Sequence, residues 1–388
     1  MRQILEVGDI MRLGVPKEIK VHEYRVAITP DGVHEAVASG HVVVVETGSG
    51  KAVGFPDELY CAAGATIARS ATDVFEAADM IVKVKEPQPH ECAMLRPGQI
   101  LFTYLHLAAD RPQMKLLMAS QCTAIAYETV TDDKGRLPLL APMSEVAGRM
   151  AVQVGAHCLE IAQGGEGILL GGVPGVAPAV ITVLGGGVVG TNAARIAFGM
   201  GADVTILDRS QTRLAELDGL YGPRLKTVFA TAAAVEAHVV AADLVIGAVL
   251  IPGASAPKLV TRTMVAKMKK GAVIVDVAID QGGCIETARP TTHSDPSYVV
   301  DGVVHYCVTN MPAAVPNTST LALTNATFPY LLKLAKLGAK SAIQEDQGIA
   351  AGVNTFNGIL TCKPVAESQH RDWQPVSELV GHGGEGVS

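Results

Sequence analysis

The chain has 388 residues, of which 48% are hydrophobic and 18% are charged, and its formal net charge is −7. An acidic chain without a polybasic run offers no basic face to nucleic acid or to an anionic membrane, so neither is expected as a partner. At about 150 residues per domain, this length predicts two domains that each bury their own core.

Seven cysteines are scattered along the chain, and none forms a CxxC pair. This usage predicts reduced thiols, a cytoplasmic location and no structural zinc. The N-terminus lacks a basic segment leading into an apolar one, and no apolar run reaches the roughly 20 residues that span a membrane. Met11 begins the first strand-like string, MRLGVPKE, so residues 1–10 are expected to be an N-terminal extension.

Between Met11 and Glu128, short β-branched runs alternate with alanine-rich helical segments. The predicted strands are HVVVVE, ADMIVKVKE, QILFTYLHL and TAIAYE, and a helix is expected to begin at Arg111-Pro112. Continuous apolar strands of this kind are buried on both faces. The pattern therefore predicts a parallel α/β domain with helices on each side of the sheet.

A turn-rich string, TDDKGRLPLLAP, interrupts the pattern at residues 131–142. Ser144 followed by Glu145 predicts a helix N-cap with an acid in the first turn. This helix is expected to run to Gln163 and to connect two domains. After a glycine-rich loop, a second α/β run begins with AVITVLGGGVVG and continues through DVTILD, ADLVIGAV and AVIVDVAI.

The C-terminal part of the chain, beyond Asn310, contains the helical string TSTLALTNATFPYLLKLAK. Pro329 is expected to kink this helix, because proline lacks a backbone N–H. The segment is expected to return to the first domain. The last residues, GHGGEGVS, are expected to be a disordered tail.

The second α/β run contains a G-x-G-x-x-G motif between a predicted strand and a predicted helix. Its glycines are Gly185, Gly187 and Gly190, with Val188 following the second. Small residues there let backbone amides approach a pyrophosphate. Such a motif is weak evidence in a chain with 40 glycines, since it is also compatible with a plain glycine turn.

Asp208 strengthens the motif, because it ends the next predicted strand, at the spacing of roughly 20 residues that dinucleotide-binding domains show. A carboxylate there accepts a hydrogen bond from a ribose 2′-hydroxyl and repels a 2′-phosphate. The pair predicts NAD as the cofactor, with some tolerance of NADP left by Arg209. The alternative is a surface aspartate.

Lys83, Lys85 and His106 lie near the ends of predicted strands in the first domain. A lysine at a buried strand end indicates an anionic partner, because burial of an unpaired charge is costly. His106 is compatible with a catalytic histidine or with a satisfied core histidine. Arg25, within VHEYRVAITP, is compatible with a functional or a surface arginine.

The string VDVAIDQGG in the second domain ends at the carboxyl edge of the sheet, where ligands bind in folds of this type. Asp280 is therefore expected to face a ligand or to cap the strand, whereas Asp276 is expected to be structural. The histidines lack paired metal-ligand spacing, and no G-x-S-x-G serine motif is present.

Long strings over Met11 to about Ala351 closely resemble the alanine dehydrogenase and nicotinamide nucleotide transhydrogenase family. They include GVPKEIKVHEYRVAITP, KVKEP, LHLA, AYET, PLLAPMSEVAGR, QGG at 163–165, GGVPGV, IPGASAPKL, VDVAIDQGG, RPTTH and TNATFPY. The resemblance implies NAD-dependent oxidative deamination of L-alanine to pyruvate and ammonium.

For the fold, the resemblance implies an α/β protein with two Rossmann-like doubly wound domains and an active site in the cleft between them. The substrate domain would comprise residues 11–138 and 312–388, and the NAD-binding domain residues 139–311. It also implies a homohexamer.

The resemblance implies that Arg25 and Lys85 bind the substrate's carboxylate and carbonyl groups. His106 would be the general acid/base, and Asp280 would assist proton transfer and water activation. These roles make chemical sense, because iminium hydrolysis needs a cation for the carboxylate and a group that exchanges protons near neutral pH.

The residues expected to bind the cofactor come from the glycine motif, from Asp208 and from the resemblance. They are Ser144, Gly185, Gly187, Val188, Gly190, Asp208, Arg213, Val249, Leu250, Val277, Ala278, Ile279, Asp280, Arg289, Val308, Asn310 and Met311. Two positions near the adenosine depart from the family pattern. Arg213 stands where a lysine is common, and Ala230, followed by Thr231, stands where a serine is common.

Some relatives hold a divalent ion between the glutamate that matches Glu128 and a histidine, but that second position is Leu337 here, so no metal is expected. Two other functions remain open: the NAD(H)-binding subunit of a proton-translocating transhydrogenase, and a catalytically silent NAD-binding protein. Retention of Arg25, Lys85, His106 and Asp280 together favours the dehydrogenase over both.

Overall fold

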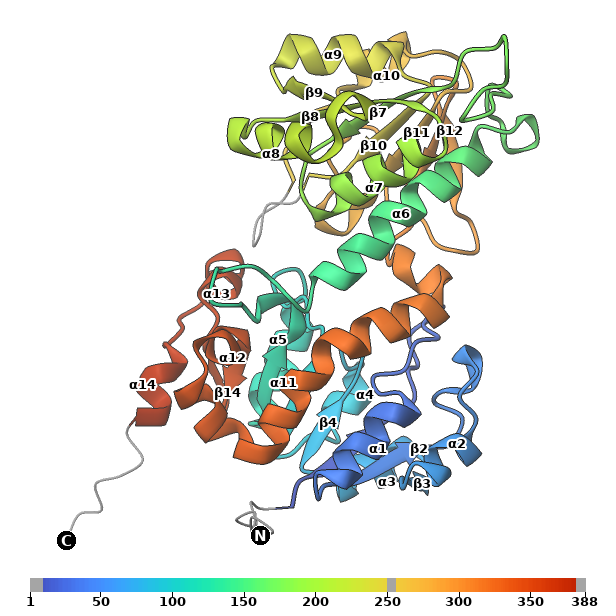
Figure 1. The fold of residues 1–388 in the computed structure, drawn as a ribbon. Coiled ribbons are helices and arrows are strands. Elements are labelled where there is room, and N and C mark those ends of the chain that lie inside the picture. Colours follow the sequence, from blue (N-terminus) through green and yellow to red (C-terminus); the bar gives the residue numbers. More distant parts are fainter. Residues whose placement is uncertain (1–9, 250–255, 382–388) are drawn as a thin grey trace, which may run out of the picture. The chain divides into compact units, whose positions relative to one another are not determined.

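The computed structural model describes residues 10–249 and 256–381. The chain divides into two compact units (Figure 1): unit 1 comprises Met1–Pro142 and Val315–Ser388, and unit 2 comprises Met143–Ala314. These boundaries lie a few residues from the expected ones. The expected N-terminal extension, apart from Ile10, the expected tail beyond Gly381, and Leu250 lie outside the described residues.

Unit 1 is built on an eight-stranded sheet in the order β15-β14-β6-β5-β4-β1-β2-β3. Strands β1 to β6 are parallel, and β14 and β15 add an antiparallel edge. The strands are β1 (Arg12–Val15), β2 (Val42–Glu46), β3 (Thr66–Ala68), β4 (Met80–Val82), β5 (Ile100–Thr103), β6 (Thr123–Ala126), β14 (Val353–Phe356) and β15 (Ile359–Leu360).

Helices cover this sheet because the strands are apolar on both faces. Residues of α3, α5 and α13 form one buried cluster with β4, β5 and β6, while α1 lies against β2 and α11 against α1. The helices of unit 1 are α1 (Pro30–Ala38), α2 (Asp57–Ala62), α3 (Ala71–Ala77), α4 (Pro89–Cys92), α5 (Arg111–Ser120), α11 (Pro316–Glu345), α12 (Gln347–Gly352), α13 (Lys363–Gln369) and α14 (Val376–Gly381). The predicted start of α5 at Arg111 is confirmed, and Asp110 caps it by accepting the Gln113 amide.

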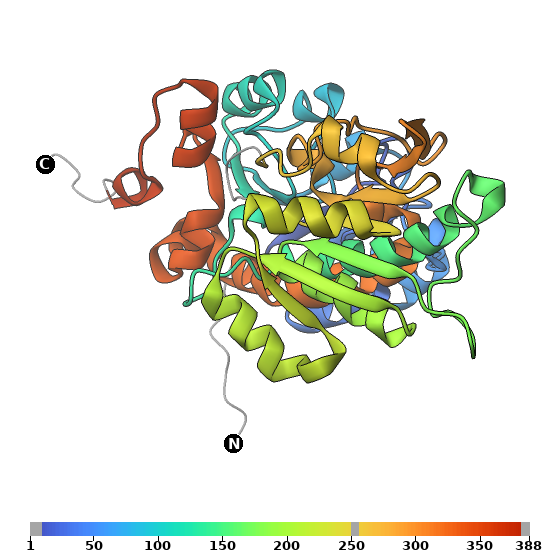
Figure 2. The ribbon, with the colours of Figure 1, turned by 90° about the horizontal axis from the view of Figure 1, so that it is seen from above.

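Unit 2 contains a seven-stranded sheet in the order β12-β13-β11-β10-β7-β8-β9, parallel except for β12. Helix α7 lies on one face and α9 on the other (Figures 1 and 2). The strands are β7 (Val180–Leu184), β8 (Asp203–Asp208), β9 (Lys226–Phe229), β10 (Leu244–Gly247), β11 (Val273–Asp276), β12 (Ser297–Val300) and β13 (Val303–Tyr306). The helices are α6 (Ala141–Cys158), α7 (Val188–Gly199), α8 (Gln211–Tyr221), α9 (Ala232–Ala241) and α10 (Arg262–Lys267).

Six strands of each sheet follow the doubly wound order 3-2-1-4-5-6, so both units are Rossmann-like and the predicted fold class is confirmed. In each sheet the winding reverses between the first and fourth strands, which are β1 and β4 in unit 1 and β7 and β10 in unit 2. Ligands bind beyond the carboxyl ends of the strands at such a reversal. Among the described helices, none is both long and apolar enough to cross a membrane.

One predicted helix is wrong in its bounds. Helix α6 begins at Ala141 and ends at Cys158, so Ser144 lies in the first turn instead of capping it, and residues 161–163 form a separate 3-10 turn. Pro142 fits the first turn, where the missing N–H costs nothing. In α11, Pro329 lies inside the helix, so the kink expected there stays a prediction. The backbone leaves helical angles further on, at Gly338 (φ 67°, ψ 167°), because a residue without a Cβ adopts positive φ at little cost.

Candidate functional site

The carboxyl ends of four adjacent strands in unit 1 carry the expected substrate residues. Arg25 lies in the segment after β1, Lys85 follows β4, His106 follows β5, and Glu128 follows β6 in a 3-10 turn, Tyr127–Thr129. Because these strands are parallel neighbours in the order β6-β5-β4-β1, their carboxyl ends meet at one edge. This edge includes the reversal between β1 and β4, where a ligand site is expected.

Arg25 is buried, with 2% of its surface exposed, so the surface interpretation is wrong. Its Nε and Nη2 donate to the two carboxylate oxygens of Glu23, at 2.7 and 2.6 Å. Burial opposes the charge, but the paired carboxylate outweighs it and raises the pKa of Arg25 above its ordinary value. The guanidinium is thus a permanent, oriented cation.

Lys83 and Lys85 differ sharply although they are two residues apart. The Lys83 ammonium is fully buried and donates to Glu91 at 2.7 Å and to Glu18 at 3.2 Å. Burial disfavours its charge, yet the two carboxylates raise the pKa of Lys83. The anionic partner expected for this lysine is therefore supplied by the chain itself, and Lys83 has a structural role.

The Lys85 side chain is only 12% exposed, and its ammonium lies 3.6 Å from Oε2 of Glu86. That separation is too long for a hydrogen bond. Within residues 10–249 and 256–381, no acceptor lies within hydrogen-bonding distance of the Lys85 ammonium. A largely enclosed ammonium with unused donors is suited to bind an anionic or carbonyl oxygen.

His106 has left-handed backbone geometry (φ 52°). Its amide donates to Glu128 at 2.6 Å, and its ring stacks on Tyr104 with centroids 5.7 Å apart. The side chain is 48% exposed, so the core-histidine interpretation is wrong. A non-glycine residue held in this conformation costs about 1 kcal/mol or more, and such strain is concentrated at functional sites.

Glu128 contributes a function that the sequence did not reveal. Its carboxylate accepts the amides of Leu105 and His106 and lies 3.8 Å from Nδ1 of His106. Glu128 thereby fixes the turn that presents the histidine. Its position at the end of the strand next to that of His106 was the signal that could have indicated this contact.

In unit 2, the glycine motif forms a close-packed turn from β7 into α7. Gly185 has φ 100°, and a Cβ at Gly190 would lie 1.8 Å from the Gly185 carbonyl oxygen. At Gly187, which begins α7 as its N-cap, nothing described lies within 4 Å of where a Cβ would be. The turn therefore has the open backbone cradle that a pyrophosphate requires at a helix N-terminus.

Asp208, at the end of β8, connects this turn to the next strand. Its carboxylate accepts the Gly186 amide at 2.6 Å and the Ser210 amide at 2.7 Å. Each carboxylate oxygen has a second lone pair, so the group can still accept from a ribose hydroxyl. Arg213 braces the same turn by donating to the Gly186 carbonyl at 2.6 Å and to Thr191 at 2.8 Å.

The other expected cofactor residues lie beyond the carboxyl ends of parallel strands or near them. Val249 follows β10, and Val308, Asn310 and Met311 follow β13. Residues 277–280 lie in the 3-10 turn after β11, Val277–Gln281. Ser144 lies in α6, and Arg289 lies between β11 and β12, with its guanidinium 4.0 Å from the centre of the Tyr298 ring.

The turn after β11 separates two aspartates. Asp276 is fully buried and caps the turn by accepting the amides of Ala278 and Ile285, at 3.1 and 3.3 Å. Burial raises the pKa of Asp276 to about 6. The predicted structural role of Asp276 fits these contacts, and because Asp276 is the cap, the exposed Asp280 is left for another role.

A doubly wound sheet with a glycine cradle and an acid on the following strand defines a dinucleotide-binding protein of the Rossmann type. Residues 14–147 match the family model described as alanine dehydrogenase/PNT, N-terminal domain, and residues 151–363 match the corresponding C-terminal domain. The chain belongs to the alanine dehydrogenase/PNT family.

Relatives with known names match nearly the whole chain. An alanine dehydrogenase of Halomonas elongata is 58% identical over 96% of this chain and 100% of its own length. A solved L-alanine dehydrogenase is 51% identical with a TM-score of 0.89, covering 93% of this chain and 99% of that one. A solved transhydrogenase from Sinorhizobium meliloti is 27% identical with a TM-score of 0.77, covering 91% of this chain and 99% of that one.

Proposed function

We propose that this protein catalyses the reversible NAD-dependent oxidative deamination of L-alanine to pyruvate and ammonium. The observation that carries the proposal is the 58% identity to a named alanine dehydrogenase over almost the entire chain. The clustering of Arg25, Lys85 and His106 at the carboxyl edge of one sheet supports it, because these are the groups that a small amino acid and its oxo acid require.

The cradle of Gly185, Gly187 and Gly190 would hold the pyrophosphate of NAD, and Asp208 would accept a ribose hydroxyl. When bound, NAD supplies the hydride acceptor. Asp208 favours NAD over NADP because a carboxylate repels a 2′-phosphate. The remaining contacts expected of unit 2, such as Val249, would surround the rest of the cofactor.

Within unit 1, Arg25 would hold the substrate carboxylate, and the Lys85 ammonium would donate to the carboxylate or to the carbonyl oxygen. Loss of hydride from Cα leaves an iminium, which water attacks. His106 would take the proton from that water and return it to the departing amine, as a half-exposed imidazole can do near neutral pH. Asp280 would assist these proton transfers.

We further propose a cytoplasmic homohexamer. Apolar side chains on a single stretch of unit 2 support self-association, since Ile161, Leu169, Val173 and Val176 are all exposed. Contiguous exposed apolar surface is typical of interaction sites. Light scattering coupled to size-exclusion chromatography tests the assembly: a mass near six chains supports it, and a monomer contradicts it.

The test of activity is NADH formation from NAD and L-alanine, run beside NADH consumption with pyruvate and ammonium. Turnover in both directions supports the dehydrogenase. The similarity to a solved transhydrogenase makes hydride transfer to a partner's NADP the second candidate. Tight NADH binding without either reaction would favour that candidate, or a catalytically silent NAD-binding protein.

A further inference from the structure

We propose that Lys20 and Glu86 are positioning residues for substrate binding: Lys20 holds the Glu86 carboxylate so that the Lys85 ammonium stays available to the oxo acid. This inference rests on the proposed function, because it assumes that Lys85 binds the substrate. Neither Lys20 nor Glu86 is needed to touch the substrate.

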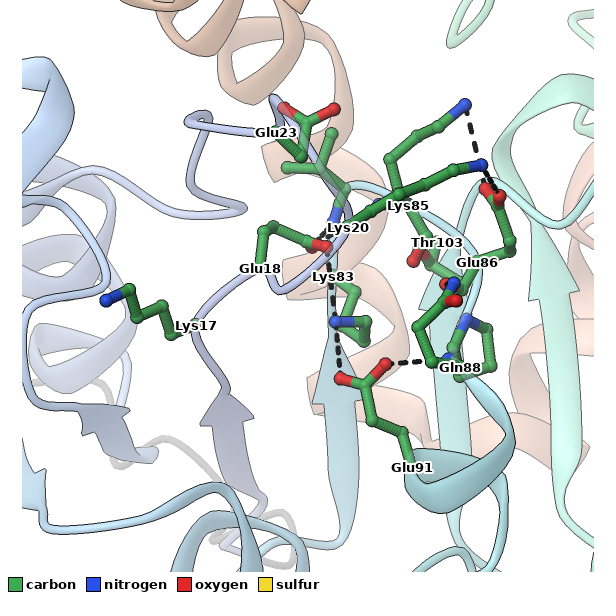
Figure 3. Close-up of polar contacts among 12 residues, drawn as sticks. Lys17, Glu18, Lys20, Glu23, Lys83, Lys85, Glu86, Gln88, Glu91 and Thr103 are labelled. Atoms are coloured by element: carbon green, nitrogen blue, oxygen red, sulfur yellow. Dashed lines mark hydrogen bonds and ion pairs between the residues drawn. The ribbon is translucent and has the colours of Figure 1, made fainter.

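The Glu86 carboxylate faces two ammonium groups, as Figure 3 shows. Its Oε1 accepts a hydrogen bond from Lys20, while its Oε2 lies 3.6 Å from the Lys85 ammonium. Glu86 is 13% exposed and Lys20 is 42% exposed. The carboxylate is thus hydrogen-bonded to Lys20, whereas it forms with Lys85 only an ion pair that is too long for a hydrogen bond.

The main chain of Lys85 is held independently of its side chain. Glu18 accepts the amides of Val84 at 2.6 Å and Lys85 at 3.3 Å, and the Thr103 hydroxyl donates to the Lys85 carbonyl at 3.0 Å. The buried Lys83 ammonium supplies the counter-charge for Glu18. Only the Lys85 side chain can therefore respond to a change at Glu86.

The charges of Lys20, Lys85 and Glu86 sum to one positive unit. Glu86 is a carboxylate at neutral pH because, although burial opposes its ionisation, Lys85 and Lys20 keep its pKa below the ordinary value. Two ammonium groups then face one carboxylate. Removal of Lys20 would leave a neutral Lys85-Glu86 pair, in which the now unshared carboxylate competes with the substrate for the Lys85 donors.

Oε2 of Glu86 gives the geometry that such competition needs. This oxygen is buried and accepts no hydrogen bond from any residue in the described part of the chain. A small rotation of either side chain would close the 3.6 Å gap to a hydrogen bond. When Lys20 is present, the Glu86 carboxylate already has an ammonium partner. A hydrogen bond between Glu86 and Lys85 is then less favourable in free energy than it would be without Lys20.

The experiment measures binding of oxamate, an unreactive analogue of pyruvate, to the full-length protein saturated with NADH. Four variants are compared with the wild type: Lys20→Met, Glu86→Gln, the double variant, and Lys17→Met. Lys17 is the matched control, because it is an exposed lysine on the same segment whose side chain points away from the cluster (Figure 3).

We expect Lys20→Met to weaken oxamate binding about tenfold, the effect of one lost favourable charge contact. Its KM for pyruvate should rise by about the same factor with kcat within about threefold, because only binding is affected. The double variant should return the oxamate affinity to within about threefold of the wild type, since it restores the net charge and frees Lys85. Glu86→Gln and Lys17→Met should bind oxamate no more than about threefold more weakly than the wild type.

Two results would overturn the inference: oxamate affinity of Lys20→Met equal to that of the wild type, or a double variant that binds no better than Lys20→Met. A purely structural role for the pair would leave the double variant at least as impaired as either single one. If the wild type itself fails to reduce pyruvate, the proposed function fails instead, so the two failures are distinguishable.

Discussion

The carboxylate of Glu128 accepts the backbone amide of His106 at 2.6 Å, and His106 has φ 52°. The hydrogen bond stabilises a backbone conformation that histidine rarely adopts, and the stacked Tyr104 ring fixes the direction of the imidazole. Glu128, from the neighbouring strand end, thus determines where the proposed acid/base group stands.

The first prediction concerns that group. His106→Ala should lower kcat for alanine oxidation by about 10²- to 10⁴-fold, the usual contribution of general acid-base catalysis, while NADH binding stays unchanged. Steady-state kinetics and NADH fluorescence titration measure the two effects. His34→Ala, at an exposed position of α1, is the control. Near-normal turnover of the His106 variant would rule out its acid/base role.

The second prediction concerns cofactor selection by Asp208. Asp208→Asn should raise the KM for NAD about tenfold and increase the ratio of NADP to NAD activity, because it removes the repulsion of the 2′-phosphate and one charge-assisted acceptor. Asp203→Asn, at the other end of β8, changes a partly exposed aspartate paired with Lys226 and should leave that ratio unchanged. If the two variants had the same ratio of NADP to NAD activity, this would argue against cofactor selection by Asp208.

The third prediction concerns the third glycine of the motif. Gly190→Ala should abolish measurable NADH binding or weaken it by at least about a hundredfold, since the new Cβ would lie 1.8 Å from the Gly185 oxygen and displace the cradle. Gly199→Ala, at the end of the same helix, has open space around its Cβ and should bind NADH normally. Calorimetric titration with NADH compares them; equal affinities would exclude the packing argument.

The fourth prediction concerns the buried cluster of Glu18, Lys83 and Glu91. Lys83→Met should lower the free energy of unfolding of unit 1 by about 3–5 kcal/mol, because it leaves buried carboxylates without their cation. Trp373, the single tryptophan, packs against the core of this unit and reports urea unfolding by fluorescence.

Neutralising Glu18, Lys83 and Glu91 together distinguishes the effect of an unpaired buried charge from the effect of altered packing. The triple variant Glu18→Gln, Lys83→Met, Glu91→Gln should be less destabilised than Lys83→Met, since no unpaired charge stays buried. Lys17→Met, at an exposed position, should match the wild type. Wild-type stability in Lys83→Met would refute the structural role of Lys83.

The fifth prediction concerns pH. The pKa of Asp276 is raised to about 6 by burial, above its value of 3.8 in an unfolded chain. A raised carboxyl pKa contributes stability below the unfolded pKa, and this contribution is lost as the pH rises through 6. Between pH 4.5 and 7.5 the loss should be about 2 kcal/mol. Thermal melting at the two pH values should show this loss in the wild type and not in Asp276→Asn; parallel pH profiles would contradict it.

Local sequence was sufficient to predict where the strands end, where the glycine turn lies and that Asp208 ends the next strand. Apolar runs and glycine turns depend mainly on neighbouring residues, so a local pattern predicts them. The same reasoning misplaced the start of α6 and did not predict the break of α11 at Gly338. The capping signal of Ser144 failed because the helix begins three residues earlier and has Pro142 in its first turn, where a missing N–H costs nothing.

The sequence alone determined that Lys83, Lys85 and His106 lie near the ends of strands of a parallel sheet, since apolar runs mark where strands end. The order of those strands, which brings Arg25 to the same edge, came from the tertiary structure. The sequence did not determine which lysine is available. Lys83 and Lys85 have nearly the same local context, and only the tertiary structure brings Glu18 and Glu91 to Lys83 and leaves Lys85 beside Glu86. That choice depends on contacts between residues far apart in the chain, whose energies no local pattern encodes.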